Sequence, residues 1–139
     1  MHRYDPARQR LALGLAGLAG LVDATGFVVA GGYLTSFMSG NTTRMGVELS
    51  QNPALALAPL GLIGAFLAGV IGGAMIARRS EGRRKRVLLG LIAGLLSAAA
   101  GLLASGVAIP FLALSAMAMG LANNVFVREG EVTVGVTYM

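Results

Sequence analysis

Cysteine and tryptophan are absent from the 139 residues of this chain, and histidine occurs once, as His2. Without cysteine the chain has no disulfide scaffold, no thiolate zinc site and no cysteine nucleophile. A single histidine at the amino terminus also removes histidine-based acid/base catalysis and the Ser-His-Asp arrangement. Since no other nucleophile stands beside a base and no metal-binding constellation is visible, we expect no catalytic activity, no metal site and no cofactor.

Charged residues are scarce as well. They make up 12% of the chain, against 55% hydrophobic residues, and the mean hydropathy is +0.74. A soluble domain of this length could not bury so much apolar surface, so the composition predicts one all-α membrane domain, residues 1–139, in the lipid bilayer. The net charge of +5 resides in a few residues between apolar stretches. This placement indicates the membrane topology of the chain, and it excludes a nucleic-acid partner.

Charge-free length divides the chain into four predicted transmembrane helices, because one crossing takes about 20 apolar residues. They cover residues 11–33, 53–77, 87–104 and 110–127. Asn52 and Pro53 provide a cap and a first-turn residue for the second helix. Residues 87–127 are about twice as long as one crossing requires, and Ser105, Gly106 and Pro110 predict the bend between the last two helices.

Basic residues gather before the first predicted helix and between the second and third, in residues 78–86. The positive-inside rule places both segments, and therefore the amino terminus, in the cytoplasm, and it places Arg44 outside. So strong a bias excludes dual topology. Asp23 and the apolar sequence after it favour an uncleaved first helix over a signal peptide.

Small residues recur at every fourth position of the predicted helices, as they do where membrane helices pack closely. On the second helix the stripe consists of Gly61, Ala65, Gly69, Gly73 and Ala77. Two interpretations stay open and are compatible with each other. The stripe packs against other helices of the same chain, or it forms the interface of a homo-oligomer or of a larger membrane complex.

The polar chemistry of the chain is concentrated between Asp23 and Gly46. An unpaired carboxylate near the middle of a membrane helix costs about 2.5–3.5 kcal/mol, so Asp23 is expected to face the bundle interior, a cavity or a cation. Residues 35–46 combine hydroxyl groups with apolar Phe37 and Met38, which predicts a segment that re-enters the membrane and turns at Gly40. The alternative is that these polar groups only cap helix ends and that Arg44 pairs with Asp23 or Glu48.

An internal repeat adds one residue to the candidate site. The sequence GLVDATGF at residues 20–27 returns as GLANNVF at residues 120–126, and residues 35–38 are echoed by residues 136–139. Three crossings separate the two copies, so they would run in opposite directions through the membrane, as inverted repeats of transporters do. The chain is then one three-helix unit plus the start of an inverted second unit. The candidate polar or solute site comprises Asp23, Ser36, Ser39, Asn41, Thr42, Arg44 and Asn123.

The motifs VDA at residues 22–24, SFMSGNTTRMG at residues 36–46, AMGLAN at residues 118–123 and TYM at residues 137–139 resemble those of the YoaK-like family. This is a group of bacterial inner-membrane proteins that carry a domain of unknown function. The resemblance covers essentially the whole chain. It implies about six helices in two three-helix units. In the family the TYM motif of the second unit continues into Thr-Gly, so this chain is expected to be truncated within its second unit.

Two functions from different classes remain open. One is a transporter-like protein of the bacterial inner membrane, whose polar residues line a site near the bilayer midplane for a cation or a small polar solute. This hypothesis rests on analogy between folds. The other is a non-catalytic accessory or structural subunit, which docks its small-residue stripes against a larger membrane complex. In that case the polar groups of the motif only form hydrogen bonds with one another.

Overall fold

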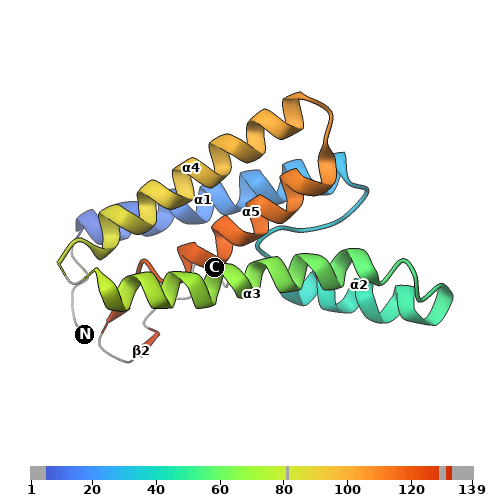
Figure 1. Ribbon diagram of the computed structural model, residues 1–139, viewed down its shortest axis with the longest axis horizontal. Helices are drawn as coiled ribbons and strands as arrows, with labels where there is room; N and C mark the ends of the chain where they lie inside the picture. Colours follow the sequence, from blue (N-terminus) through green and yellow to red (C-terminus); the bar gives the residue numbers. More distant parts are fainter. Residues whose placement is uncertain (1–5, 81, 129–130, 133–139) are drawn as a thin grey trace.

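The computed structural model describes residues 6–80, 82–128 and 131–132, and this part of the chain is essentially all-helical (Figure 1). The elements are α1 (Pro6–Val29), α2 (Met38–Gln51), α3 (Leu57–Arg79), α4 (Arg84–Ala104) and α5 (Ala108–Ala122). They are followed by a short antiparallel pair, β1 (Val127–Arg128) and β2 (Glu131–Val132). The predicted echo at residues 136–139 lies outside the described residues.

Three helices are long and apolar enough to cross a membrane. They are Gln9–Val29 within α1, α3 and α4. Their residues are mostly exposed in the isolated chain, with 17 to 22% of the most apolar window buried. The fourth predicted helix, residues 110–127, corresponds to α5, which ends at Ala122. Its 15 residues measure about 22 Å, less than the hydrocarbon thickness of about 30 Å, so a fourth crossing stays a prediction.

Helix α5 is the centre of the molecule. It lies between α3 and α4, and α1 packs against it from a further side (Figure 1). Apolar residues all around α5 are buried, and they take part in both hydrophobic clusters of the described chain. A helix that is apolar on every side is expected at such a position. α1 and α5 run in opposite directions (Figure 1), as the inverted-repeat hypothesis requires.

Helices α3 and α5 approach each other at their backbones. A Cβ atom at Gly69 would collide with the carbonyl oxygen of Met117, and one at Gly120 would collide with that of Phe66. Gly73 would meet the side chains of Asn124 and Leu121. Contact this close requires residues without side chains on both helices.

Only part of the small-residue stripe of α3 therefore packs against α5. Gly69 and Gly73 are buried against α5, which is the packing within the chain that the sequence offered as one of two interpretations. Ala65 is half-buried and packs against the hydrophobic cluster that contains Leu62 and Phe111. Gly61, in contrast, is exposed with no atom near its missing Cβ.

The chain between α1 and α2 turns back along α1. Gly31 has a φ of 68°, and the amide of Gly32 donates to the carbonyl of Phe27 at 2.8 Å, which ends the helix in the usual glycine-dependent way. The chain then returns to the level of Gly26, whose missing Cβ would lie 3.3 Å from Thr35 Cγ2. α2 runs outward again beside α3 (Figure 1). We call residues 30–51 the returning hairpin.

Several predicted boundaries differ from the structure. The turn predicted at Gly40 within residues 35–46 is wrong, because Gly40 lies in a regular helix that starts at Met38. The helix predicted from residue 53 begins at Leu57. The amide of Ala54 donates to Asn52 Oδ1 at 3.1 Å, so the asparagine caps a turn in front of the helix instead of the helix itself.

Candidate functional site

Asp23 fastens the returning hairpin to α1. Its Oδ1 accepts hydrogen bonds from the Thr35 amide at 2.6 Å, the Thr35 hydroxyl at 2.9 Å and the Ser36 amide at 2.7 Å. Its Oδ2 accepts one from the Ser36 hydroxyl at 2.5 Å. Asp23 lies six residues before the end of α1, so this contact is about 9 Å back along the helix axis.

These four contacts explain how a carboxylate is tolerated in an apolar helix. Hydrogen bonds to a charged acceptor contribute about 1.5–3 kcal/mol each, which together outweighs the cost of about 2.5–3.5 kcal/mol of the charge in a membrane helix. Thr35 and Ser36 are buried, and their amides would otherwise lack a partner. The carboxylate therefore needs neither a bound cation nor Arg44.

Asn41 joins α2 to the segment before it through two hydrogen bonds. Its Nδ2 donates to the carbonyl of Leu34 at 2.5 Å, and its Oδ1 accepts from the Leu34 amide at 3.1 Å. The side chain is 1% exposed. An asparagine that pairs with both backbone polar groups of one residue holds the start of α2 against the irregular segment that precedes it, residues 30–37.

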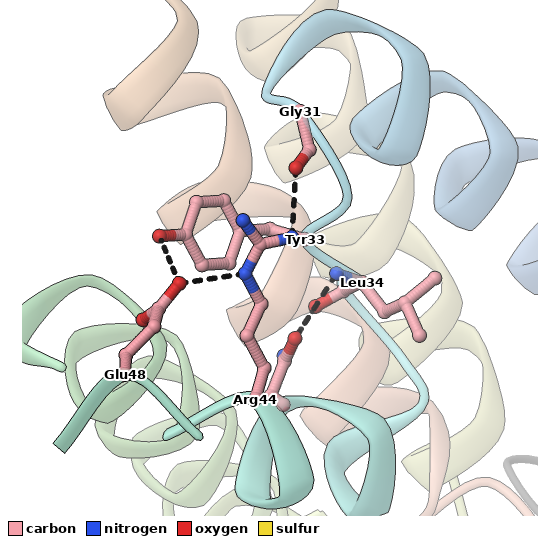
Figure 2. A network of polar contacts seen from close by, with 6 residues as sticks. Gly31, Tyr33, Leu34, Arg44 and Glu48 are labelled. Carbon is pink, nitrogen blue, oxygen red and sulfur yellow. Dashed lines mark hydrogen bonds and ion pairs between the residues drawn. The ribbon is translucent and has the colours of Figure 1, made fainter. Parts of the chain in front are cut away.

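Arg44, Glu48 and Tyr33 form a charged cluster near the turn at Gly31 (Figure 2). Arg44 Nε lies 2.7 Å from Glu48 Oε1, and Arg44 Nη1 donates to the Gly31 carbonyl at 2.7 Å. The guanidinium group stacks on the Tyr33 ring at 4.2 Å from its centroid. The Tyr33 hydroxyl donates to the same Glu48 oxygen at 3.2 Å. The cluster thus ties α2 to the residues that follow α1.

Two of these groups have shifted protonation equilibria. Burial raises the pKa of Tyr33 above its ordinary value of 10.0, and the charge of Glu48 adds to the rise. The hydrogen bond to Glu48 raises the pKa of Arg44 above its ordinary value. At neutral pH the phenol therefore stays a donor and the guanidinium stays charged.

The structure brings together only some of the residues that the sequence nominated. Asp23 and Ser36 are bonded directly, and Asn41 lies in the same hairpin. Ser39 and Thr42 are exposed, and the Thr42 hydroxyl bonds to the Met38 carbonyl within its own helix. The ion pair of Arg44 is with Glu48, which was one of the two partners considered.

Asn123 lies elsewhere. Leu112 is the α5 residue beside Gly26, and Asn123 follows it by eleven residues, about 16 Å along the axis. Its neighbour Asn124 is the one that contacts α3, by donating from Nδ2 to the Val70 carbonyl at 3.0 Å. The equivalence of Asp23 and Asn123 in a repeat stays a prediction, but the two residues do not share a site.

Tyr33 was missed by the sequence analysis, and Glu48 appeared there only as a possible partner of Arg44. The spacing of Arg44 and Glu48, four residues apart on one helix, could have indicated their pairing once α2 was recognised as a helix. For Tyr33 no local signal exists, because its contact with Glu48 depends on the return of the chain. Among the described residues no group of three or more histidine, cysteine, aspartate or glutamate side chains could hold a metal ion.

A family model matches most of the chain. The model of a family described as a protein of unknown function, DUF1275, matches residues 11–139. No curated protein and no solved structure matches the chain. The match agrees with the resemblance in the sequence to a family with a domain of unknown function.

Proposed function

The chain belongs to the DUF1275 family, and we propose that it is a multi-pass carrier of the bacterial inner membrane, with a binding site for a small polar solute at the returning hairpin. The observation that carries this proposal is the hairpin itself, which returns along α1 as far as Asp23, about 9 Å from the end of that helix, and then leaves again as α2. In lipid, irregular backbone at such depth is tolerated only beside protein or a water-filled cavity, and carriers use interrupted helices of this kind as solute sites.

The geometry favours a polar or negatively charged solute over a cation. Both oxygens of Asp23 are occupied by donors of the chain. Arg44 has 35% of its side chain exposed, and it presents a planar group of N–H donors, which suits carboxylate and similar acceptors. Arg44 is thus the proposed solute-binding residue, and Asp23, Ser36 and Asn41 hold the hairpin that positions it.

The exposed apolar surface of α1 is the face through which the alternative, an accessory subunit, would dock. Leu13, Leu21 and Val28 are 68, 65 and 81% exposed, and α1 packs chiefly against α5. Lipid or another protein would cover this surface. In this second candidate function the hairpin serves only to complete the fold.

Solute binding tests the first candidate directly. We expect at least one compound from a panel of acetate, lactate, glycine, phosphate and glycerol to raise the unfolding temperature of the purified chain, since a ligand that binds only the folded state stabilises it. Arg44→Gln should abolish the rise and Arg44→Lys should retain part of it, because lysine keeps the charge without the planar fork. The same compound, radiolabelled, should exchange across proteoliposomes.

Two results would contradict this function. One is a wild-type chain that no compound stabilises and whose proteoliposomes take up no more label than empty liposomes. The other is stabilisation that Arg44→Gln leaves unchanged. If the first result is accompanied by a foreign subunit in native mass spectra after gentle extraction, the accessory-subunit function replaces the carrier.

A further inference from the structure

The second carboxylate oxygen of Glu48 is buried without a partner. Glu48 is 7% exposed, and its Oε1 takes both contacts of the side chain, from Arg44 and from Tyr33. Oε2 finds no hydrogen-bond donor among the residues that the structure describes. A buried acceptor without a partner costs about 1–3 kcal/mol, and more if it carries charge.

In the part of the chain that the structure describes, the charged or titratable side chains in contact with Glu48 are Arg44 and Tyr33. On α3, which packs against α2, the charged residues are Arg78 and Arg79 at the far end. α5 carries no ionisable side chain. Asp23 of α1 is occupied by Thr35 and Ser36. Among the described residues, Glu48 also belongs to no group of three or more histidine, cysteine, aspartate or glutamate side chains that could hold a metal ion.

We propose that Glu48 is a proton-binding site, and that a proton on Oε2 releases Arg44 from Glu48 so that it can bind solute. The proton comes from bulk water and converts the carboxylate into a neutral carboxylic acid, and no electron is transferred. The buried charge and the attraction to Arg44 disappear together. Arg44 stays charged without Glu48, because a guanidinium group is protonated at any physiological pH, and it keeps its contacts with Gly31 and the Tyr33 ring.

The consequence is coupled binding of a proton and a solute. Nε of Arg44, which is engaged by Glu48 in the unprotonated chain, becomes available to an acceptor group when Glu48 is neutral. Protonation therefore strengthens solute binding, and solute binding favours protonation by the same factor. This coupling rests on the proposed function, whereas the proton site itself does not.

Infrared difference spectra of the full chain in nanodiscs, acid minus neutral, test the proton site. We expect wild type to gain the C=O band of one non-hydrated carboxylic acid, and Glu48→Gln to lose that band completely. Glu81→Gln, which removes a carboxylate from the basic loop, should keep it. A wild-type spectrum without the band, or a Glu48→Gln spectrum that still contains it, overturns the proposal.

A second variant keeps the test decisive if Glu48→Gln does not fold. In Arg44→Gln the cation that favours the charged carboxylate is gone, so the band should reach half of its height at a pH at least one unit higher than in wild type. An unchanged midpoint contradicts the proposal. The spectra need no solute, so a Glu48 band without any solute binding rejects the carrier function alone, and solute binding without the band rejects the proton site alone.

Discussion

Replacing Asp23 with leucine is expected to detach the returning hairpin from α1 while the protein still inserts in the membrane. The substitution removes the acceptor of four hydrogen bonds and leaves the buried amides of Thr35 and Ser36 without a partner. Each orphaned amide costs about 1–3 kcal/mol. We expect a loss of at least about 3 kcal/mol in hairpin docking, which corresponds to more than hundredfold faster hydrogen exchange of residues 34–41.

Two further variants define the cause of this effect. Asp23→Asn keeps one acceptor oxygen but loses the charge, so exchange should increase by about tenfold. Thr25→Val is the matched control, because the Thr25 hydroxyl bonds only within α1, to the Leu21 carbonyl, and exchange in the hairpin should not change. Equal exchange rates in wild type and Asp23→Leu would mean that Asp23 does not fasten the hairpin.

The second large effect is expected at the seam between α3 and α5. An isoleucine at Gly69 must displace the backbone of Met117, which cannot move aside as a side chain can. Overpacking of side chains already costs about 1–3 kcal/mol, so forcing two helix backbones apart should cost more than about 3 kcal/mol. We expect Gly69→Ile to yield little monodisperse protein in detergent, with a strongly lowered unfolding temperature.

Gly64→Ile is the control for the same helix. Gly64 is exposed with no atom near its missing Cβ, so the added side chain should be accommodated, and it replaces a residue of poor helix propensity. The two substitutions add the same volume and the same hydrophobicity. If both variants unfold at the temperature of wild type, the backbone contact between α3 and α5 is not part of the fold.

The sequence predicted the apolar helices more reliably than their partners. Charge-free length indicated α1, α3 and α4 because a membrane helix must be apolar over its whole length. The sequence does not show which glycines contact another helix. Gly61 and Gly69 belong to the same stripe, yet only Gly69 lies against α5, because the stripe marks a helix face and not the point along it where two helices cross.

The candidate site was predicted in composition but not in geometry. The density of polar residues after Asp23 indicated a returning segment, since such residues are rare in lipid without a partner. The bonds from Thr35 and Ser36 to Asp23 depend on the path of residues 30–37, which contains two glycines with positive φ and follows no periodic pattern. α2 was not recognised as a helix because its sequence is rich in Ser, Thr, Asn and Gly, which are weak helix formers.

Cysteine accessibility at four positions tests whether residues 30–51 return to the side from which they enter the membrane. Single cysteines at Ala7, Gln51, Ser80 and Ser105 are exposed to an impermeant maleimide on intact and on permeabilised cells. We expect Gln51 and Ser105 on the outside, and Ala7 and Ser80 on the inside, the side of the basic loop. Labelling of Ala7 and Gln51 on the same side would show that residues 30–51 cross the membrane, and it would contradict the returning hairpin.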